Sequence, residues 1–337
     1  MSGTAEKIKT FSSLFAILSA AALFAVLAAS LKYGAVDVPW QAVLDFLCGR
    51  GDVLSPDIMI IGQLRMPRAL CAMTAGAAFA VSGAVLQGVL RNPLASPEIT
   101  GVSSGGAVAG LAAMLFFHAG ANTTVICIFA GAVLTAAGVY MLAWKNGIDP
   151  LRIILSGVAF SSICGAAASA MMYLESEKAP QILAFTVGSL TSRTSDDLIA
   201  VLPFVFSGFL LALCLAKQLD ILQLGDDTAR SLGVRVELSR SILLLSAVLM
   251  AAGAVSLAGL MGFAGLVVPH TVRLLSRSSD SRKLLLRSAV AGAFFVTLCD
   301  TLGKSIAVPA EIPAGVLTSL AGPPFFLWLL LKKRRDV

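Results

Sequence analysis

Long runs of apolar residues recur along the chain and are separated by short polar connections. About 20 consecutive apolar residues suffice for a helix to cross a bilayer. Runs of that kind predict about ten spanning helices, near residues 11–31, 67–88, 98–117, 123–143, 152–174, 197–216, 239–258, 260–275, 285–303 and 313–331. The predicted fold class is therefore an all-α membrane protein, a polytopic bundle of transmembrane helices.

Composition agrees with this pattern. Of the 337 residues, 57% are hydrophobic and only 13% are charged, whereas about a quarter of the residues in soluble domains are charged. No low-complexity or soluble segment interrupts the apolar runs, so residues 1–337 are predicted to form a single transmembrane domain. The outer connection 32–63 is too polar to span and is expected to lie as a short helix on the outer surface.

The positions of the basic residues predict the orientation. The formal net charge is +6, but Lys and Arg lie between the apolar runs and form no strip of the kind that binds nucleic acid. With both termini cytoplasmic, only seven of the 25 basic residues fall outside, namely Lys32, Arg50, Arg65, Arg68, Lys178, Arg193 and Lys304. The positive-inside rule favours this topology.

The first 30 residues also resemble a secretory signal, because an apolar core follows Lys7 and Lys9 and precedes small residues. That core is long enough to span, and its removal would leave an odd number of spans, so we expect a retained first helix. Of the six cysteines, only Cys48 is predicted to face the oxidising side, which predicts no disulfide framework.

The inner connection 217–240 contains the segment LGDDTARSLGV at 224–234. Gly225 interrupts the chain, Asp226 can cap a helix, and Asp227 complements the helix dipole. Gly233 suits the left-handed residue that follows a helix. The pattern predicts a surface helix of about two turns, and it fits a solvated connector and a docking knob for a cytoplasmic partner equally well.

Two short matches to enzyme motifs lack the context that catalysis needs. GVSSG at 101–105 matches G-x-S-x-G of hydrolases, but no strand precedes it and the chain has only His118 and His270 as histidines. GKS at 303–305 ends like a Walker A loop, but Leu298 stands in place of its first glycine. We therefore expect no catalytic residue, no ATP hydrolysis by this chain, and no metal site, since two scattered histidines form no ligand cluster.

Four segments together resemble the FecCD family of ABC permeases, which includes permeases for ferric siderophores, haem and cobalamin. They occur in the family's order over nearly the whole chain, at residues 65–110, 224–234, 259–275 and 309–333. The resemblance implies a multi-pass permease subunit of an ABC importer in a bacterial inner membrane. It also implies a second permease subunit, in a homodimer or a close heterodimer with the homodimer favoured. The other implied partners are two cytoplasmic ATPases that bind ATP and Mg²⁺ and a periplasmic or lipid-anchored binding protein, with no cofactor on this chain.

The resemblance assigns roles to individual residues. The ATPase-coupling residues are Leu224, Gly225, Asp226, Asp227, Ala229, Arg230, Leu232 and Gly233. The cations for docking of the binding protein are Arg65, Arg68 and Lys304. A lysine offers a point charge rather than the fork of the arginine that the family has more often at the third position. For Arg65 and Arg68, snorkelling to the headgroups is the alternative. The residues of the translocation pathway and its gate are Asn92, Pro93, Lys145, Pro150, Leu151 and Arg152.

An iron chelate such as a ferric siderophore is the cargo that the resemblance favours, because it is the commonest cargo of the family. Haem and cobalamin stay open, although Pro150 and Leu151 replace small hydroxyl residues of cobalamin permeases. An ion-coupled secondary transporter is the alternative from another class. It would be expected to have matched halves with broken helices or intramembrane carboxylates, and the sequence shows no convincing repeat. An intramembrane hydrolase would lack a base.

Overall fold

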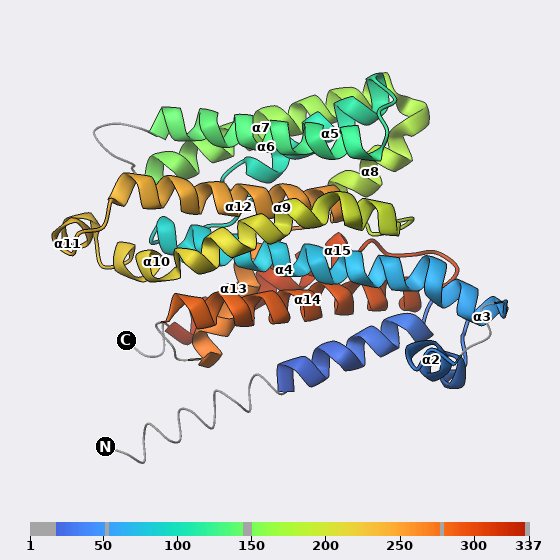
Figure 1. Ribbon diagram of the computed structural model, residues 1–337. Helices are drawn as coiled ribbons and strands as arrows, with labels where there is room; N and C mark the ends of the chain where they lie inside the picture. The colour runs from blue at the N-terminus through green and yellow to red at the C-terminus, as the bar shows by residue number, and fades with distance from the viewer. Residues whose placement is uncertain (1–17, 51–53, 144–149, 277–279, 334–337) are drawn as a thin grey trace, which may run out of the picture.

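The computed structural model describes residues 18–50, 54–143, 150–276 and 280–333 (Figure 1). No strand occurs in these ranges. After a first helix at Leu18–Lys32, the elements are α2 (Trp40–Leu47), α3 (Pro56–Met59), a π-helical turn (Ile60–Arg65), α4 (Met66–Val89), α5 (Val102–Phe116), α6 (Ala121–Ala143), α7 (Pro150–Leu174), a 3-10 turn (Ser176–Lys178), α8 (Ala179–Val187), α9 (Ser195–Cys214), α10 (Ala216–Leu222), α11 (Asp226–Ser231), α12 (Val236–Ala258), α13 (Ala264–Ser276), α14 (Ser281–Ile306) and α15 (Ala314–Lys333).

Six described helices are long and apolar enough to cross a membrane: Pro56–Val89, Asn122–Ala143, Leu151–Leu174, Ser195–Cys214, Val236–Ala258 and Ser281–Ile306. Leu18–Lys32 and Val102–Phe116 are shorter apolar helices. The all-helical membrane fold is thereby confirmed. The count of about ten spans and the cytoplasmic side of both termini stay predictions, and residues 1–17, with Lys7 and Lys9, lie outside the described ranges.

Small residues allow the central helices to pack backbone to backbone. A Cβ atom on Gly76 of α4 would lie 2.2 Å from the carbonyl oxygen of Gly292 in α14. A Cβ atom on Gly83 would lie 1.7 Å from the carbonyl oxygen of Gly265 in α13. No side chain fits in such a space, so these glycines set the spacing of the helices around α4. As a result α4 and α12 form the buried centre of the bundle.

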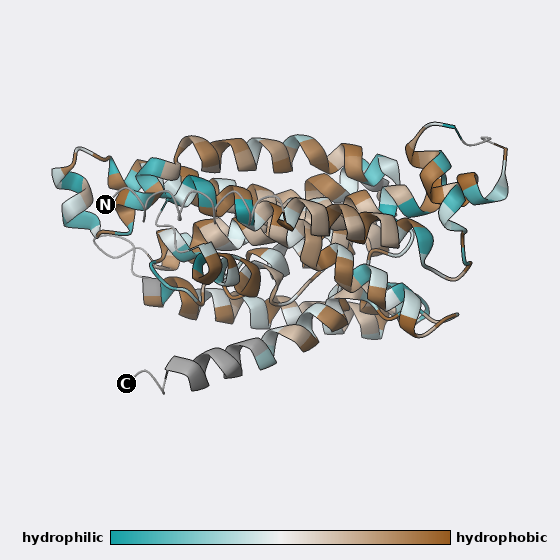
Figure 2. Ribbon diagram, turned by 90° about the horizontal axis from the view of Figure 1, so that it is seen from below, coloured by the Kyte–Doolittle hydropathy of each residue, from teal (hydrophilic) through white to brown (hydrophobic). Residues whose placement is uncertain are grey.

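Polar residues gather at the two ends of the bundle and apolar ones along its length (Figure 2). At one end lie α10 and α11, and at the other lie α2, α3 and the start of α8 (Figure 1). The expected outer-surface helix corresponds to α2, whose Trp40 and Leu44 are exposed. Two polar ends separated by an apolar length of helix is the distribution that a membrane imposes.

Candidate functional site

The segment 224–234 projects from one end of the bundle between α10 and α12 (Figure 1). Two glycines with positive φ bracket α11, Gly225 at +111° and Gly233 at +81°. Residues with a Cβ are strained in such conformations, so the glycines determine where the helix begins and ends. The predicted helix is confirmed. The prediction that Asp226 caps it is wrong, because Gly225 precedes the first turn and the Asp226 carboxylate binds elsewhere.

The outward face of this segment combines apolar and charged side chains. Leu224 is 64% exposed and Leu232 is 59% exposed, and the side chains of Asp227 and Arg230 are also exposed. Arg230 lies 3.6 Å from Asp227, an exposed pair of the kind that contributes about 0 to 1 kcal/mol. These charges can therefore pair instead with a partner protein. Ala229 is fully buried and holds the helix against the bundle.

Asp226 points in the opposite direction, into the bundle. Its Oδ1 accepts a hydrogen bond from Arg91 Nη2 and another from Arg240 Nη2, each at 2.8 Å. Partial burial raises the pKa of Asp226, but the Arg240 hydrogen bond and the charges of Arg240, Arg91 and Arg230 outweigh it and lower the pKa below its ordinary value. The carboxylate is therefore ionised at neutral pH, as the two guanidinium groups require.

At the other end of the bundle Arg68 joins three segments. Its Nε and Nη2 donate to the Asp300 carboxylate of α14 at 2.9 to 3.1 Å, and its Nη1 donates to Glu311 Oε2 at 2.8 Å. Thr191 Oγ1 donates to the same Glu311 oxygen at 3.1 Å. The Asp300 side chain is 1% exposed and the Arg68 side chain 13%. Arg68 therefore does not snorkel but ties α4 to α14 and to the loop that follows α14, and Glu311 in that loop is bonded in turn to the loop after α8.

Arg65 and Lys304 are likewise bonded inside the chain. The Arg65 guanidinium donates to the carbonyl oxygens of Leu31, at 2.7 Å, and of Lys32 and Val36. Lys304 Nζ donates to the carbonyl and hydroxyl oxygens of Ser30 at 2.7 and 2.9 Å. Because Arg65 is 7% exposed and Lys304 is 4% exposed, neither presents its charge at the outer surface. Their part in docking stays a prediction.

The loop 90–101 carries the predicted Asn92-Pro93 break. Asn92 Oδ1 accepts a hydrogen bond from the Leu94 amide at 2.9 Å, which closes a short turn. Of the other gate residues, Leu151 and Arg152 are exposed in the first turn of α7. Lys145 and the side chain of Pro150 lie outside the described residues.

The same loop packs closely on α7. A Cβ atom on Gly157 would lie 2.4 Å from the Ile99 carbonyl oxygen. Ser161 Oγ donates to the Glu98 carbonyl oxygen at 3.2 Å. The Glu98 side chain, which sequence reasoning missed, accepts a hydrogen bond from the Phe263 amide at 3.3 Å through Oε2. Glu98 therefore joins the loop 90–101 to the α12–α13 connection. The sequence feature that could have identified Glu98 is its position as an acidic residue in the break between two apolar runs.

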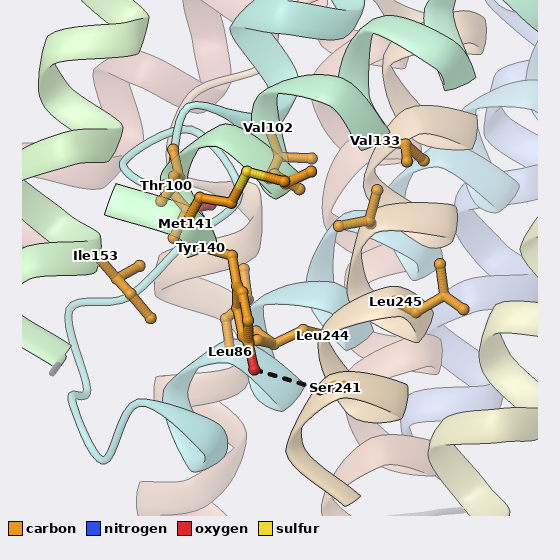
Figure 3. Close-up of a pocket in the computed structure, with 14 residues that line it drawn as sticks. Leu86, Thr100, Val102, Val133, Tyr140, Met141, Ile153, Ser241, Leu244 and Leu245 are labelled. Carbon is orange, nitrogen blue, oxygen red and sulfur yellow. Dashed lines mark hydrogen bonds between the residues drawn. The ribbon is translucent and has the colours of Figure 1, made fainter. Parts of the chain in front are cut away.

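A pocket of about 310 Å³ lies between α6, α12 and the starts of α5 and α7 (Figure 3). Its apolar lining includes Val133, Ile153 and Leu245. The Tyr140 hydroxyl and Ser241 Oγ, 3.4 Å apart, are among its few polar groups. No group of three or more His, Cys, Asp or Glu suited to a metal ion occurs in the described part of the chain. The pocket thus offers shape rather than charge or coordination.

Two spanning helices are poorly covered by the rest of the chain, and their free faces differ. In the most apolar stretch of each helix, only 11% of α7 and 17% of α9 is buried inside the protein. The exposed face of α9 carries Leu202, Phe206 and Leu210, large apolar residues that suit lipid. The α7 helix also exposes large apolar residues such as Leu155 and Ile163. In addition it exposes a stretch of small residues: Ser162, Gly165, Ala166, Ser169 and Ala170. Small and hydroxyl residues favour a neighbouring helix over lipid.

An apolar helical bundle with polar ends, and with a short polar helix projecting from one of them, is the architecture of a polytopic membrane protein. Comparison with known proteins assigns the particular family. The model of the FecCD transport family matches residues 22–332, and the chain belongs to that family. Its members are permease subunits of ABC importers whose ATPase activity resides in separate subunits.

Among curated proteins, the chain is 38% identical over 319 residues to the Fe(3+)-citrate import system permease protein YfmE of Bacillus subtilis, covering 94% of this chain and 95% of that one. It is also 38% identical over 306 residues to the cobalamin import system permease protein BtuC of Halobacterium salinarum, covering 90% and 81%. Among solved structures, it matches an inward-facing transporter assigned to the metal-chelate type of ABC transporters, with a TM-score of 0.81, 30% identity, and 94% and 98% coverage.

Proposed function

We propose that this ABC importer permease forms the translocation pathway for an iron chelate, a ferric siderophore, across a bacterial inner membrane. About ten spans with both termini in the cytoplasm complete the proposed topology. The observation that carries the proposal is the exposed α11 segment at one polar end of an apolar bundle, in a chain of the FecCD family. A secondary transporter has no need of a docking helix of this kind.

The cargo is argued from relatives. The similarity to a ferric citrate permease and to a metal-chelate transporter supports an iron chelate. Sequence identity alone does not distinguish an iron chelate from cobalamin, because the chain is 38% identical to both the ferric citrate permease and the cobalamin permease. Pro150 and Leu151, in place of small hydroxyl residues, weigh against cobalamin, and haem is the second candidate. Asn92, Pro93, Leu151 and Arg152, with Lys145 and Pro150, are proposed to act at the pathway and its inner gate.

The proposed partners occupy three surfaces. An ATPase subunit binds the outward face of 224–234, where Leu224 and Leu232 supply apolar contact and Asp227 and Arg230 supply charge. A second copy of the chain covers α7, because that face is rich in small residues. A binding protein docks at the end that carries α2 and α8. Contact of Arg65 or Lys304 with that protein would require the segment around Ser30 and Leu31 to move, since these cations are bonded to it.

The cargo is tested by uptake into proteoliposomes. The permease is reconstituted with its ATPase, ATP is enclosed, and the binding protein is added outside with ferric siderophores, haem or cobalamin. We expect ATP-dependent accumulation of a ferric siderophore at least tenfold above that of cobalamin. Preferential accumulation of haem or cobalamin would overturn the cargo assignment and leave the permease assignment intact.

The second-copy surface is tested by thiol cross-linking in a cysteine-free background. Ser162→Cys or Ser169→Cys on α7 should give cross-linked dimers with a short bifunctional reagent. Phe206→Cys on α9 is the matched control, since it is also exposed and lies on a helix of similar length. Dimers formed through the α9 position but not through either α7 position would contradict the proposed interface.

A further inference from the structure

Asp226 is the acidic residue of the segment 224–234, called here the coupling segment, that forms ion pairs with the rest of the bundle. Its neighbour Asp227 is fully exposed and pairs only weakly with Arg230 at 3.6 Å. Asp226 instead uses one oxygen to bind Arg91 and Arg240, both at 2.8 Å. We call these three side chains the Asp226 clasp. Two adjacent carboxylates on one short helix therefore face opposite sides, one toward a partner and one toward the bundle.

Arg240 anchors the clasp in a spanning helix. It lies in the second turn of α12 and is 2% exposed. Its Nε and Nη1 have no hydrogen-bond partner among the described residues. A buried guanidinium is costly unless an anion compensates it, and Asp226 lies within hydrogen-bond distance. The ion pair of Asp226 with Arg240 thus holds the start of α11 to α12, and each group compensates the charge of the other.

Arg91 extends the clasp to a second spanning helix. It follows α4 directly after the residue that ends the helix, and its φ of +49° turns the chain into the loop 90–101. A Cβ atom on Gly225 would lie 3.6 Å from Arg91 Nη1, so the guanidinium lies beside the start of α11. A displacement of α11 therefore pulls on the end of α4 through this ion pair.

The loop that begins at Arg91 ends against α7. Its residues Ile99 and Thr100 contact the backbone at Gly157, and Ser161 donates to the Glu98 carbonyl oxygen. Close-packed backbones cannot slide independently, because no soft side chain separates them. The loop 90–101 consequently joins the clasp at one end to α7, the proposed pathway and dimer helix, at the other.

We propose that Asp226 is a positioning residue that transmits movement of the docked α11 to α4, α12 and, through the loop 90–101, to α7, and that it does not itself contact the ATPase. This inference rests on the proposed function, in which an ATPase docks on α11. It divides the coupling segment into an outward docking face and an inward clasp. Loss of the docking face weakens association, whereas loss of the clasp leaves association intact and disconnects hydrolysis from transport.

The test compares adjacent, chemically identical changes in the complete reconstituted transporter. For Asp226→Asn we expect ATPase association within twofold of the wild type and at least a tenfold fall in chelate transported per ATP hydrolysed. For Asp227→Asn we expect weaker ATPase association with the same transport per ATP in the complexes that form. Asp226→Glu should recover part of the ratio, because it restores the charge.

A double change tests whether Arg91 and Asp226 act together. Arg91→Gln should lower transport per ATP on its own, and adding it to Asp226→Asn should cause little further loss, since both break the same link. Arg91→Gln also decides the matter if Asp226→Asn does not purify as a monodisperse protein, because it leaves the buried Arg240–Asp226 pair in place.

The outcomes separate the clasp from the proposed function. A wild-type transport ratio in Asp226→Asn, or in Arg91→Gln where the first variant does not fold, overturns the clasp. Loss of ATPase association in Asp226→Asn also overturns it, because Asp226 would then be a docking residue. If the wild-type chain itself neither binds an ATPase nor transports with ATP, the proposed function fails before the clasp is reached.

Discussion

Arg68 binds one buried and one partly exposed carboxylate. Replacing each carboxylate in turn therefore compares the contributions of a buried and an exposed ion pair to the free energy of unfolding. Asp300 and Glu311 both accept hydrogen bonds from Arg68, at similar distances of 2.8 to 3.1 Å, but their side chains are 1% and 31% exposed. Asp300→Asn removes the buried anion and leaves a largely buried guanidinium with one remaining partner. Glu311→Gln removes an anion that water partly solvates.

Removal of one member of a buried pair costs about 3 to 5 kcal/mol. Because Glu311 still compensates Arg68, we expect Asp300→Asn to lower the free energy of unfolding by about 3 kcal/mol, the lower end of that range. Exposed pairs contribute about 0 to 1 kcal/mol, so Glu311→Gln should cost about 1 kcal/mol or less. The double replacement Arg68→Met with Asp300→Leu should recover most of the loss, since the guanidinium and its buried anion are then removed together.

The assay is unfolding by sodium dodecyl sulfate in mixed micelles. Cys71 and Cys299 are 0% and 5% exposed and lie near Arg68 and Asp300 in the sequence. Their modification reports unfolding in a background from which the other four cysteines have been removed. The reasoning is refuted if Glu311→Gln costs as much as Asp300→Asn, or if the apolar double replacement is less stable than Asp300→Asn alone.

Three further predictions concern packing, topology and pH. Gly83→Ala should cost about 1 to 3 kcal/mol through overpacking, because its Cβ atom would meet the Gly265 carbonyl. Gly120→Ala, with nothing within 4 Å of its Cβ atom, should cost little in the same unfolding assay, and equal losses would contradict the packing. An impermeant thiol reagent should label Cys48 in intact spheroplasts but not Cys71 or Cys299, and labelling of Cys48 only after permeabilisation would reverse the topology. The depressed pKa of Asp226 means that its stabilising contribution is present above the unfolded value of about 3.9 and is lost as pH falls through the folded pKa. The stability difference between wild type and Asp226→Asn should accordingly stay constant from about pH 8 to about pH 5, and a change centred near neutral pH would contradict the assignment.

The sequence predicted those helices whose positions depend on residues close together in the chain. The apolar runs predicted the helical membrane bundle, and Gly225 and Gly233 predicted the position of α11. The start of α13 was less predictable. The run 260–275 yields α13 only from Ala264, because Gly259 and Phe263 adopt positive φ and the Leu260 amide bonds to the Phe185 carbonyl of α8. Gly259 is a local sign of this break, but the position at which α13 begins depends on a partner that is distant in the sequence.

The direction in which charged side chains point could not be predicted for the same reason. Asp226 lies 135 residues from Arg91, and Arg68 lies 232 residues from Asp300. A single sequence shows that these residues are charged and near helix ends, which suits a docking surface as well as an internal tie. The structure shows internal ties for Arg68 and Asp226, and buried cations at Arg65 and Lys304, because the packed helices bring their partners together.

The central claim is that this permease couples ATP hydrolysis in a separate subunit to import. Its most direct test is chelate uptake into proteoliposomes that contain the permease with either the wild-type ATPase or one whose Walker A lysine is replaced. We predict uptake with the wild-type ATPase and none with the inactive ATPase. The uptake with the wild-type ATPase should be undiminished when ionophores collapse the proton and sodium gradients. Uptake that persists with the inactive ATPase and disappears with the ionophores would contradict the account and identify an ion-coupled carrier.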